Sequence, residues 1–589
     1  MNKFLLTINT VKYMTCRQWK YRLYYMVRNR HLNRYPKQSD SIDSYRPIYY
    51  LYSCIYSNPE SLNKANDILL NKFETISKIK LEYDSVIDWD VKKNNYRLVC
   101  FKLNSFKFLL WLSDAYSITK EVKYIAKGFD LIDDWINQNE SLIKGDKWNP
   151  YVIAERIMHW IGFISKYSTE KRDVSKYVNS IYSQAHELEQ SLEYQLGANH
   201  LLSEARALMY AGAFLKINEL YNLGKKVLFE ETKEQFLDDG GHYERSVSYH
   251  VESLQQCFEA AVLMHDLEDK DYYKMVEIVY KPFVFLNSMI MCDGNIPLVN
   301  DAAIDYPFLA KDFLSVSRYF GWNTCKSIEG DYSSRWSYPK NTVLQNLEEK
   351  SMFYNTGFYI CNFITNNHRV SIFFDVGDNG PDYNLGHTHA DALSILVTID
   401  DKPLFVDSGV FTYMPGKERE QCRSTLAHNT VEINSVSNAE IWSAFRVARR
   451  GYTKIVKFED KGDSILLEAQ YDGYSKVLGQ KMVHIRKLII NKKTCRLTVD
   501  DSFDANSENC TGIIRYHLNP ERRVTVNNSN EVQIDVLHKI STTNKLYLND
   551  CRIAEQFGIT KESKVICSEI KIKKSINYIT NIKLFDQEA

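Results

Sequence analysis

Hydrophobic residues recur at helical spacing through the first half of the chain, from about residue 40 to residue 320. In the stretch LLSEARALMYAGAFL, one helical face carries Leu201, Leu202, Ala205, Leu208, Met209 and Leu215. Gly212 lies on the same face, where a neighbouring helix can approach closely. We therefore predict that this half consists of amphipathic helices packed in pairs.

The pattern changes after about residue 350, where short runs rich in β-branched and aromatic residues follow one another. Aspartate, asparagine and glycine, which favour turns, separate these runs. The clearest runs are RVSIFFDVG, ALSILVTID, TKIVKFED, SILLEAQYDG, RLTVDDSF and EVQIDVL. Such spacing is typical of antiparallel strands.

The two halves meet in the polar segment GDYSSRWSYPKNTVLQNLEEKS, residues 330–351. We predict a helical domain over residues 1–340 and an antiparallel sheet domain over residues 341–589. This is an α+β multidomain architecture, in which helices and sheets form separate layers. A cleft between the two domains is the expected place for a ligand.

Composition and charge indicate an ordinary globular protein. The 589 residues are 44% hydrophobic and 25% charged, and Lys plus Arg equals Asp plus Glu at 74 each. The overall charge therefore provides no reason to expect nucleic acid or a membrane surface as partner. An anionic ligand must be held by local positive charge.

The cysteines and the amino terminus indicate the cellular compartment in which the protein works. Twelve cysteines are scattered singly without a CxxC pair, which favours a reducing environment. The first apolar run, in MNKFLLTINT, is short and precedes most of the nearby basic residues, unlike a secretory signal. No stretch approaches the roughly 18 apolar residues that a membrane span needs. We expect a cytoplasmic protein, with a periplasmic or secreted location as the alternative.

Histidine and aspartate gather at predicted strand ends in GHTHADALSILVTIDDKPLFVDSG, residues 386–409, and in AHNTVEI after it. His389, Asp407 and His428 offer donors that suit zinc, and three protein ligands leave a fourth position for water. Their separations of 18 and 21 residues match no short metal motif. Hydrogen-bonded residues at strand ends are therefore an equally good interpretation. His387 shares a face with His389 on an extended chain, so both can reach one site.

The stretch GGHYERSVSYH, residues 240–250, opens a predicted helix after two glycines. Tyr249 lies about 200° around the helix from the core residue Val247 and therefore faces away from that core. Arg245, four residues earlier on the same face, can hold an anionic substrate or lower the pKa of Tyr249. His250 lies only about 60° from Val247, which favours a structural role. An ordinary half-exposed tyrosine is the alternative for Tyr249.

A third motif is GANHLLSEARAL, residues 197–208, in which Asn199 and His200 precede the strong amphipathic helix. Asn199 is a good N-cap residue, and capping is the simple interpretation. The functional alternative has Asn199 and His200 projecting from the helix start into a cleft, where amide and imidazole donate to an anion.

Taken in order, NHLLSEARAL, DGGHYERSVSYH, GHTHADALSILVTIDDKPLFVDSG and RSTLAHNTVEI resemble the heparinase II/III family of polysaccharide lyases. The resemblance is specific over about residues 195–260 and 370–435. It implies an incomplete (α/α) toroid followed by a layered antiparallel β-sandwich, in agreement with the pattern above. It also implies cleavage of a uronic-acid-containing polysaccharide by β-elimination.

The resemblance assigns expected roles to the motif residues. Asn199 and His200 would neutralise the uronate carboxylate, His387 would be the base for one epimer, and Tyr249 would be the acid, or acid and base for the other. A largely structural zinc ion would be held by His389, Asp407 and His428. The candidates for contacts with the substrate are Arg245, His250 and Arg423. Trp148 and Tyr151 are candidates for lining sugar subsites, or for packing inside the toroid.

The sequence departs from the family pattern in two places. Many relatives carry two asparagines before the histidine, whereas the first position here is Ala198. An export signal, usual in relatives that degrade external polysaccharide, is not recognisable. An intracellular lyase that acts during polysaccharide synthesis or on imported oligosaccharides is therefore our hypothesis. The competing functions are a zinc-dependent glycan hydrolase and a non-catalytic glycan-binding or assembly protein.

Overall fold

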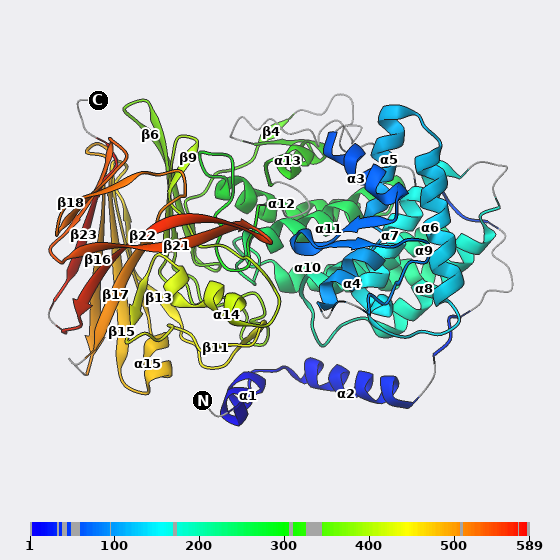
Figure 1. The fold of residues 1–589 in the computed structure, drawn as a ribbon, viewed down its shortest axis with the longest axis horizontal. Coiled ribbons are helices and arrows are strands. Elements are labelled where there is room, and N and C mark those ends of the chain that lie inside the picture. Colours follow the sequence, from blue (N-terminus) through cyan, green and yellow to red (C-terminus); the bar gives the residue numbers. More distant parts are fainter. Residues whose placement is uncertain are drawn as a thin grey trace.

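The computed structural model describes residues 3–31, 34–37, 44–48, 59–92, 94, 96–168, 173–304, 310–324, 344–506, 510–574 and 576–585. The amino-terminal part is helical and the carboxy-terminal part is built of antiparallel sheets, which confirms the predicted fold class (Figure 1). The helical and sheet parts lie next to each other along the long axis of the molecule.

The helical part is built of α-helices, with short 3₁₀ turns and two small ribbons between some of them. Its α-helices are α1 (Lys3–Val11), α2 (Cys16–His31), α3 (Pro59–Leu69), α4 (Arg97–Asn104), α5 (Phe108–Thr119), α6 (Lys123–Asn139), α7 (Pro150–Tyr167), α8 (Ser175–Ser191), α9 (Ala198–Leu215), α10 (Asn218–Gln235), α11 (Val247–Asp266), α12 (Tyr272–Met289) and α13 (Ala310–Leu314). Short 3₁₀ turns are η2 (Ile76–Lys78), η3 (Asp146–Trp148) and η4 (Ser315–Phe320), and two small ribbons pair β1 (Lys72–Glu74) with β2 (Lys80–Glu82) and β3 (Trp322–Asn323) with β4 (Gln345–Asn346). Among the described helices, none is long and apolar enough to cross a membrane.

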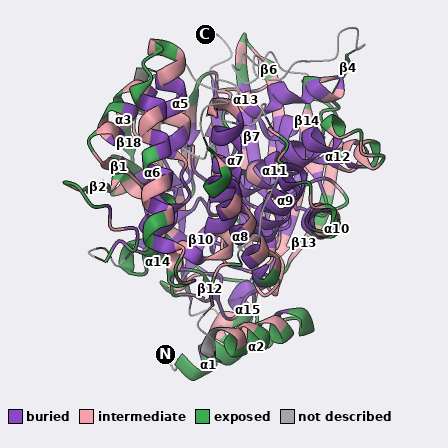
Figure 2. Cartoon of the chain, turned by 90° about the vertical axis from the view of Figure 1, so that its right-hand side faces the viewer, coloured by how far each residue is buried: buried purple, intermediate pink, exposed green. Residues whose placement is uncertain are grey.

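Successive helices pack as antiparallel pairs arranged around a common centre, an incomplete (α/α) toroid. Helix α9 contacts its partner α10 and also α7 and α11, and it is buried along almost its whole length. In Figure 2 the ribbon of α9 and α11 is coloured mostly as buried, whereas α1 and α2 are largely exposed. The apolar stripe of α9 thus packs in the core of the toroid.

Glycines set the close approach of α9 and α10. A Cβ atom on Gly212 would lie 2.4 Å from the backbone nitrogen of Tyr221, and one on Gly224 would lie 2.5 Å from the carbonyl oxygen of Ala205. Real Cβ atoms do not reach such distances, so any larger residue would push the helices apart. The prediction that a helix approaches closely at Gly212 is confirmed.

The sheet part contains an eight-stranded, a five-stranded and a four-stranded antiparallel sheet within the described residues, in the orders β13-β14-β15-β16-β23-β20-β19-β18, β5-β6-β7-β8-β9 and β10-β17-β22-β21. The strands are β5 (Met352–Phe353), β6 (Phe358–Thr365), β7 (His368–Asp375), β8 (Ile395–Ile399), β9 (Lys402–Phe405), β10 (Val431–Ile433), β11 (Ile441–Trp442), β12 (Arg446–Val447), β13 (Thr453–Asp460), β14 (Ser464–Tyr471), β15 (Met482–Asn491), β16 (Arg496–Ala505), β17 (Thr511–His517), β18 (Val524–Asn528), β19 (Glu531–Ile534), β20 (His538–Thr542), β21 (Leu546–Gln556), β22 (Ile559–Lys571) and β23 (Tyr578–Lys583). Short helices are α14 (Lys417–Arg423), η6 (Thr425–Ala427) and α15 (Gly473–Leu478).

The eight-stranded sheet packs against its neighbours through one face, as the alternation of buried and half-buried residues along its central strands shows. In β14 and β15 every second side chain is buried. The apolar side chains among them join residues of the other two sheets, such as Ile372 and Ile514, in one hydrophobic core. The predicted strands in RVSIFFDVG, ALSILVTID, TKIVKFED, SILLEAQYDG, RLTVDDSF and EVQIDVL are all present.

The predicted domain boundary between residues 340 and 341 falls in 325–343, outside the described residues. On either side, η4 ends at Phe320 and β5 begins at Met352.

The α1–α2 segment contacts both parts: the indole nitrogen of Trp442 donates to the Thr10 hydroxyl at 3.0 Å, and Arg17 pairs with Glu231 of α10 at 2.7 Å.

A buried ion pair in the eight-stranded sheet generates a stability prediction. Arg486 and Asp501 are fully buried and joined by two hydrogen bonds of 2.7 and 3.0 Å. Removing the guanidinium leaves the buried Asp501 carboxylate with the imidazole of His484, at 2.7 Å, but without the full positive charge of Arg486, and breaking a buried pair in this way costs about 3–5 kcal/mol. We expect Arg486→Met to lower the free energy of unfolding by that amount in urea denaturation.

Arg496→Met, at an exposed position of the adjacent strand β16, is the matched control and should change the free energy of unfolding by less than about 0.5 kcal/mol. A loss below about 1 kcal/mol in Arg486→Met would contradict a stabilising role for the pair.

Candidate active site

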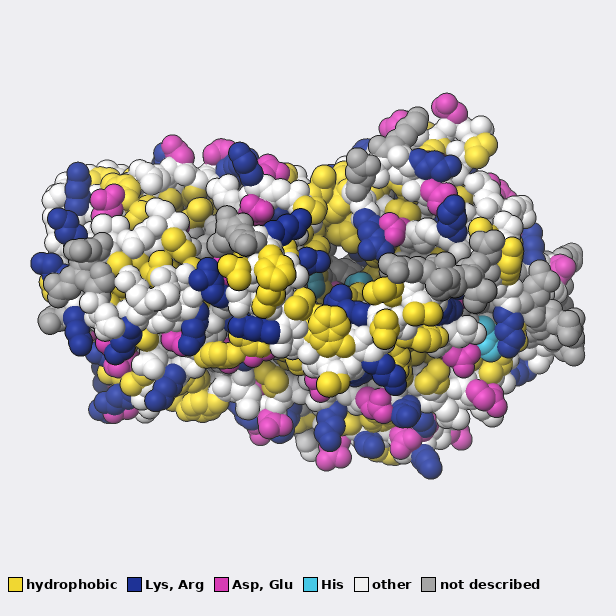
Figure 3. Space-filling view, turned by 90° about the horizontal axis from the view of Figure 1, so that it is seen from below, with side chains coloured by type: hydrophobic (Ala, Val, Ile, Leu, Met, Phe, Trp, Pro, Cys, Tyr) yellow, Lys and Arg dark blue, Asp and Glu magenta, His cyan; other side chains and the backbone are white. Residues whose placement is uncertain are grey.

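A cavity of about 1210 Å³ opens between the helical and sheet parts. Its wall combines side chains of α1, α2, α4, α7, α9 and α11 with loops of the sheet part. Figure 3, seen from the side on which α1 and α2 lie, shows a hollow between the two parts with histidine visible inside. The predicted catalytic residues Asn199, His200, Tyr249 and His387 all line this cavity.

Asn199 and His200 enter the cavity from the first turn of α9. Gly197, at φ 65°, occupies the N-cap position, so the expectation that Asn199 caps the helix is wrong. The Asn199 amide instead donates to Glu252 of α11 at 3.3 Å. His200 stacks on Tyr151 with ring centroids 4.4 Å apart, and its Nδ1 lies 2.8 Å from a carboxylate oxygen of Glu193. Tyr151 lines the cavity, as one of the two alternatives for it predicted.

The charge state of His200 is controlled by Glu193. Burial by itself would lower the pKa of His200, but the hydrogen bond and the charge of Glu193 raise it above the ordinary value. The same contacts outweigh burial in Glu193 and hold the pKa of its carboxyl below normal. Glu193 therefore favours the protonated, positively charged form of His200 in the cavity wall.

Tyr249 and His387 form a stacked pair. Tyr249 is in the first turn of α11, and His387 is in the loop between β7 and β8. Their ring centroids are 3.8 Å apart with an interplanar angle of 30°. The Tyr249 hydroxyl lies 3.2 Å from the hydroxyl of Tyr413, a cavity residue that the sequence motifs did not identify. A phenol and an imidazole thus meet at one point of the cavity.

Asp301 is a second residue of the site that the sequence reasoning missed. Its fully buried carboxylate lies 2.9 Å from Nδ1 of His387 and 2.8 Å from Nε2 of His389, and it accepts from Arg419 at 2.6 Å. Burial would raise the pKa of Asp301, but Arg419 and both histidines hold it well below the usual range. The expectation that His387 and His389 reach one site is met at this carboxylate.

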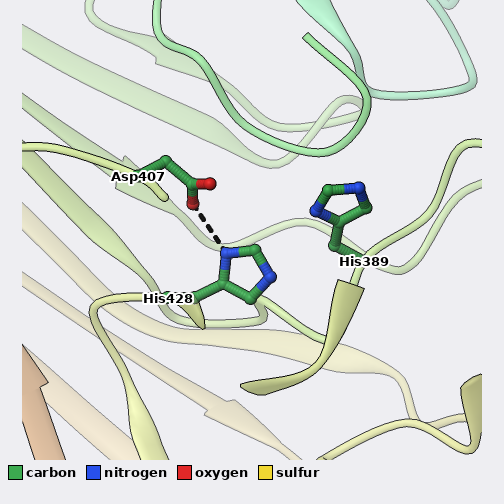
Figure 4. A group of neighbouring side chains, drawn as sticks. All are labelled: His389, Asp407 and His428. Carbon is green, nitrogen blue, oxygen red and sulfur yellow. Dashed lines mark hydrogen bonds and ion pairs between the residues drawn. The ribbon is translucent and has the colours of Figure 1, made fainter. Parts of the chain in front are cut away.

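The predicted zinc ligands are brought together. The ligand atoms of His389, Asp407 and His428 lie within 4.8 Å of one another, and all three residues are buried (Figure 4). His428 Nδ1 lies 2.6 Å from Asp407. The second ring nitrogens, Nδ1 of His389 and Nε2 of His428, have no hydrogen-bond partner among the described residues. Two unpartnered buried imidazole nitrogens beside a carboxylate fit a metal ion. These three residues do not line the cavity.

The three predicted substrate-binding residues lie elsewhere. Arg245 has φ 54° and precedes α11, so it is not on the helical face of Tyr249; its Nε donates to the carbonyl of Thr356 at 2.7 Å. His250 is in the core against the carbonyl of Pro282, at 3.0 Å. Neither side chain lines the cavity, and each is instead hydrogen-bonded to a backbone carbonyl of the protein.

Arg423 is likewise fully buried and outside the cavity wall. Its guanidinium donates to the carbonyl oxygens of Thr388, at 2.9 Å, and Ala444, at 3.0 Å. Arg423 therefore fixes the loop next to His387 and His389 rather than a ligand. Trp148 is buried and absent from the cavity wall, so packing in the toroid is the correct alternative for it.

Other cations face the cavity instead. Within the described part of the chain, four cavity-lining basic side chains have no hydrogen bond or ion pair with a carboxylate: Arg22, Lys102, Lys107 and Arg446. Burial, together with the charge of Lys102, lowers the pKa of Lys107 to about 8. An anion in the cavity would reverse this shift. The four cations come from α2, the α4 region and β12, so they surround the cavity from both parts.

Known proteins share both the sequence pattern and the fold. Heparin-sulfate lyases from Bacteroides thetaiotaomicron and Pedobacter heparinus are 22% and 24% identical over 436 and 366 residues. These matches cover 66% and 59% of this chain and 59% and 53% of the two lyases, so the chain spans less than two thirds of these relatives.

Solved structures show the same fold. "Crystal Structure of Heparinase III" superposes with a TM-score of 0.71 at 16% identity, covering 98% of this chain and 94% of that one. Heparan sulfate lyase HepC from Pedobacter heparinus has a TM-score of 0.61 at 18% identity, covering 97% and 89%. The family models "Heparinase II/III N-terminus" and "Heparinase II/III-like, C-terminal" match residues 23–325 and 346–567. The chain therefore belongs to the heparinase II/III family.

Proposed function

We propose that the protein is a polysaccharide lyase that cleaves a uronic-acid-containing glycan by β-elimination. The observation that carries this proposal is the stacked pair of Tyr249 and His387 beside Asn199 and His200 in one cavity. The heparin-sulfate lyases among the relatives support the same reaction class.

The chemistry requires three functions. A uronate C5 proton is only weakly acidic, so its carboxylate must first be neutralised by donors. The amide of Asn199 and the charged imidazole of His200 supply them. Because Asp301 accepts a hydrogen bond from Nδ1 of His387, the Nε2 lone pair of His387 is left to take the C5 proton. The resulting electron pair forms the C4–C5 double bond as the C4–O bond breaks.

The leaving oxygen on C4 takes its proton from the hydroxyl of Tyr249. For a uronate of the opposite C5 configuration, the proton lies on the other face of the ring, and Tyr249 serves as both base and acid. Arg22, Lys102, Lys107 and Arg446 provide the positive charge that an acidic glycan needs around the cleavage point.

Two alternative functions can be distinguished from the lyase by what happens to the glycan. A zinc hydrolase would add water and form no double bond, and its metal would have to face the substrate. The burial of His389, Asp407 and His428 outside the cavity wall does not favour this. A non-catalytic binding protein would hold glycan without turnover.

The first prediction from the proposed function concerns activity on a panel of uronic-acid polysaccharides. We expect ultraviolet absorbance to rise as the C4–C5 unsaturated product forms. Tyr249→Phe and His387→Ala should each lower kcat by about 100-fold or more, because each removes a proton-transfer group.

Tyr273→Phe and His368→Ala serve as matched controls, since Tyr273 is 79% exposed and His368 pairs with Asp400 away from the cavity. Both should retain full activity. Glycan binding without any rise in absorbance would reject the lyase in favour of hydrolysis or binding.

The second prediction concerns pH. The raised pKa of His200 keeps it charged, and carboxylate neutralisation is lost as the pH rises through that pKa. Glu193→Gln removes the main raising interaction. We expect the alkaline limb of the kcat/KM profile to move to lower pH in Glu193→Gln, and to stay in place in Glu230→Gln, an exposed position of α10. An unmoved limb would exclude His200 as the charged donor.

We further propose that His389, Asp407 and His428 hold a structural zinc ion. Burial lowers the pKa of His389 to about 4, so its imidazole is neutral, as a ligand must be. When bound, zinc would cross-link β9 and β10 regions with the loop that carries His387. Asp301, which contacts both His389 and His387, connects the ligand set to the proposed base.

The third prediction tests the metal directly. Purified protein should contain about one zinc ion per chain by mass spectrometry, and a chelator should lower the melting temperature. His428→Ala should lose the zinc, whereas His368→Ala should keep it. A native protein that is free of metal and unaffected by chelator would refute the zinc site while leaving the lyase proposal intact.

A further inference from the structure

The first 37 residues carry nine lysine and arginine residues and no aspartate or glutamate, although the whole chain has 74 of each charge. Helices α1 and α2 lie within this basic segment. The local charge therefore differs sharply from the overall balance. Arg17, Arg28 and Arg34 pair with Glu231 and Glu187 of the protein body, whereas the exposed lysines Lys3, Lys12 and Lys20 favour contact with an anionic surface.

Helix α2 presents an apolar stripe to solvent. Trp19, Leu23, Met26 and Val27 are 51%, 62%, 47% and 55% exposed. At about 100° per residue these four positions fall within roughly 100° of the helix circumference. A stripe of this width normally faces a protein core, yet here it faces outward.

Helix α1 continues the apolar surface. Phe4, Leu5 and Ile8 are 68%, 55% and 42% exposed, and only Leu6 of this helix is buried. The exposed lysines Lys3 and Lys12 lie on the same helix or just after it. Figure 3 shows hydrophobic and basic side chains interspersed over the face on which α1 and α2 lie.

The opposite side of α2 is attached to the protein body. The rings of Tyr21 and Tyr194 are 4.5 Å apart, Arg28 pairs with Glu187 at 2.9 Å, and the Gln18 amide donates to the carbonyl of Tyr383 at 3.0 Å. Because these contacts fix the helix, the outward stripe is preformed rather than created by folding on a partner.

We propose that the outer face of α1 and α2, the docking face, binds a bilayer that contains anionic lipids. Large apolar side chains flanked by lysines match a membrane interface, where the apolar groups enter the acyl boundary and the amines meet lipid phosphates. An acidic glycan would satisfy the lysines but leave Trp19 and Leu23 in water. A bilayer satisfies both kinds of side chain.

The experiment is co-sedimentation of the full chain with vesicles of phosphatidylcholine alone or with about 30% phosphatidylglycerol. We expect binding to the mixed vesicles, weakened by salt. Trp19→Gln combined with Leu23→Gln should reduce the apparent affinity at least about 10-fold, since each exchange removes apolar area from the interface. Brominated lipid should quench the fluorescence of Trp19, obtained as the difference between the native protein and Trp19→Phe.

Val536→Gln combined with Ile364→Gln is the matched control, because these apolar side chains are 85% and 74% exposed in the sheet part. It should bind vesicles as the native protein does. All variants alter exposed positions, so unchanged melting temperatures establish that they fold.

Soluble dextran sulfate separates lipid from polyanion binding. Lys3→Glu, Lys12→Glu and Lys20→Glu together should weaken binding to vesicles and to dextran sulfate. The Trp19/Leu23 variant should lose binding to vesicles only. Absence of binding to anionic vesicles, or equal binding by the native and Trp19/Leu23 proteins, would overturn the proposal. If the Trp19/Leu23 variant lost affinity for vesicles and for dextran sulfate equally, the proposal would also be overturned, in favour of a polyanion site.

Discussion

The buried carboxylate of Asp301 is the constraint on which the site depends. An isolated charge in such a place costs several kcal/mol, and Arg419 together with two histidines offsets that cost. Its backbone adds two more ties: the nitrogen donates to the carbonyl of His387 at 3.1 Å, and the oxygen accepts from Ser246 at 3.0 Å. One residue thus fixes the His387 loop against the start of α11, which carries Tyr249.

This arrangement explains why the site needs both parts of the molecule. The toroid supplies Asn199, His200 and Tyr249 on the ends of helices that are buried along most of their length. The sheet part supplies His387 on a loop that has no regular structure of its own. Loops of this kind hold a geometry only through side-chain contacts, here with Asp301 and Arg423.

The fold was accessible from the sequence because helical and strand periodicity are local. The stripe in α9 and the alternation in β14 each reflect neighbours a few residues apart. Contacts over long separations were not accessible: Asp301 meets His387 86 residues away and Arg419 118 residues away. Resemblance to a family identified His387, whereas periodicity could not identify the carboxylate that orients it.

Single backbone angles explain two of the local differences between prediction and structure, at Arg245 and at Asn199. The left-handed conformation of Arg245 turns its side chain away from the helical face of Tyr249. Gly197 takes over the capping position, and Asn199 is thereby placed inside the helix. Arg423 was expected at a ligand because guanidinium binds acids, yet carbonyl oxygens of neighbouring loops occupy its donors. Residue type alone does not distinguish these uses.

The cavity wall runs from Thr10 to Phe557, so its two extremes are more than five hundred residues apart along the chain. Phe557 packs against Tyr413, with ring centroids 4.8 Å apart, close to the Tyr249 hydroxyl. During synthesis, the ligand cavity therefore remains incomplete long after the last helix of the toroid has been made. A nascent chain would stay without a finished site until the strands around residue 557 emerge.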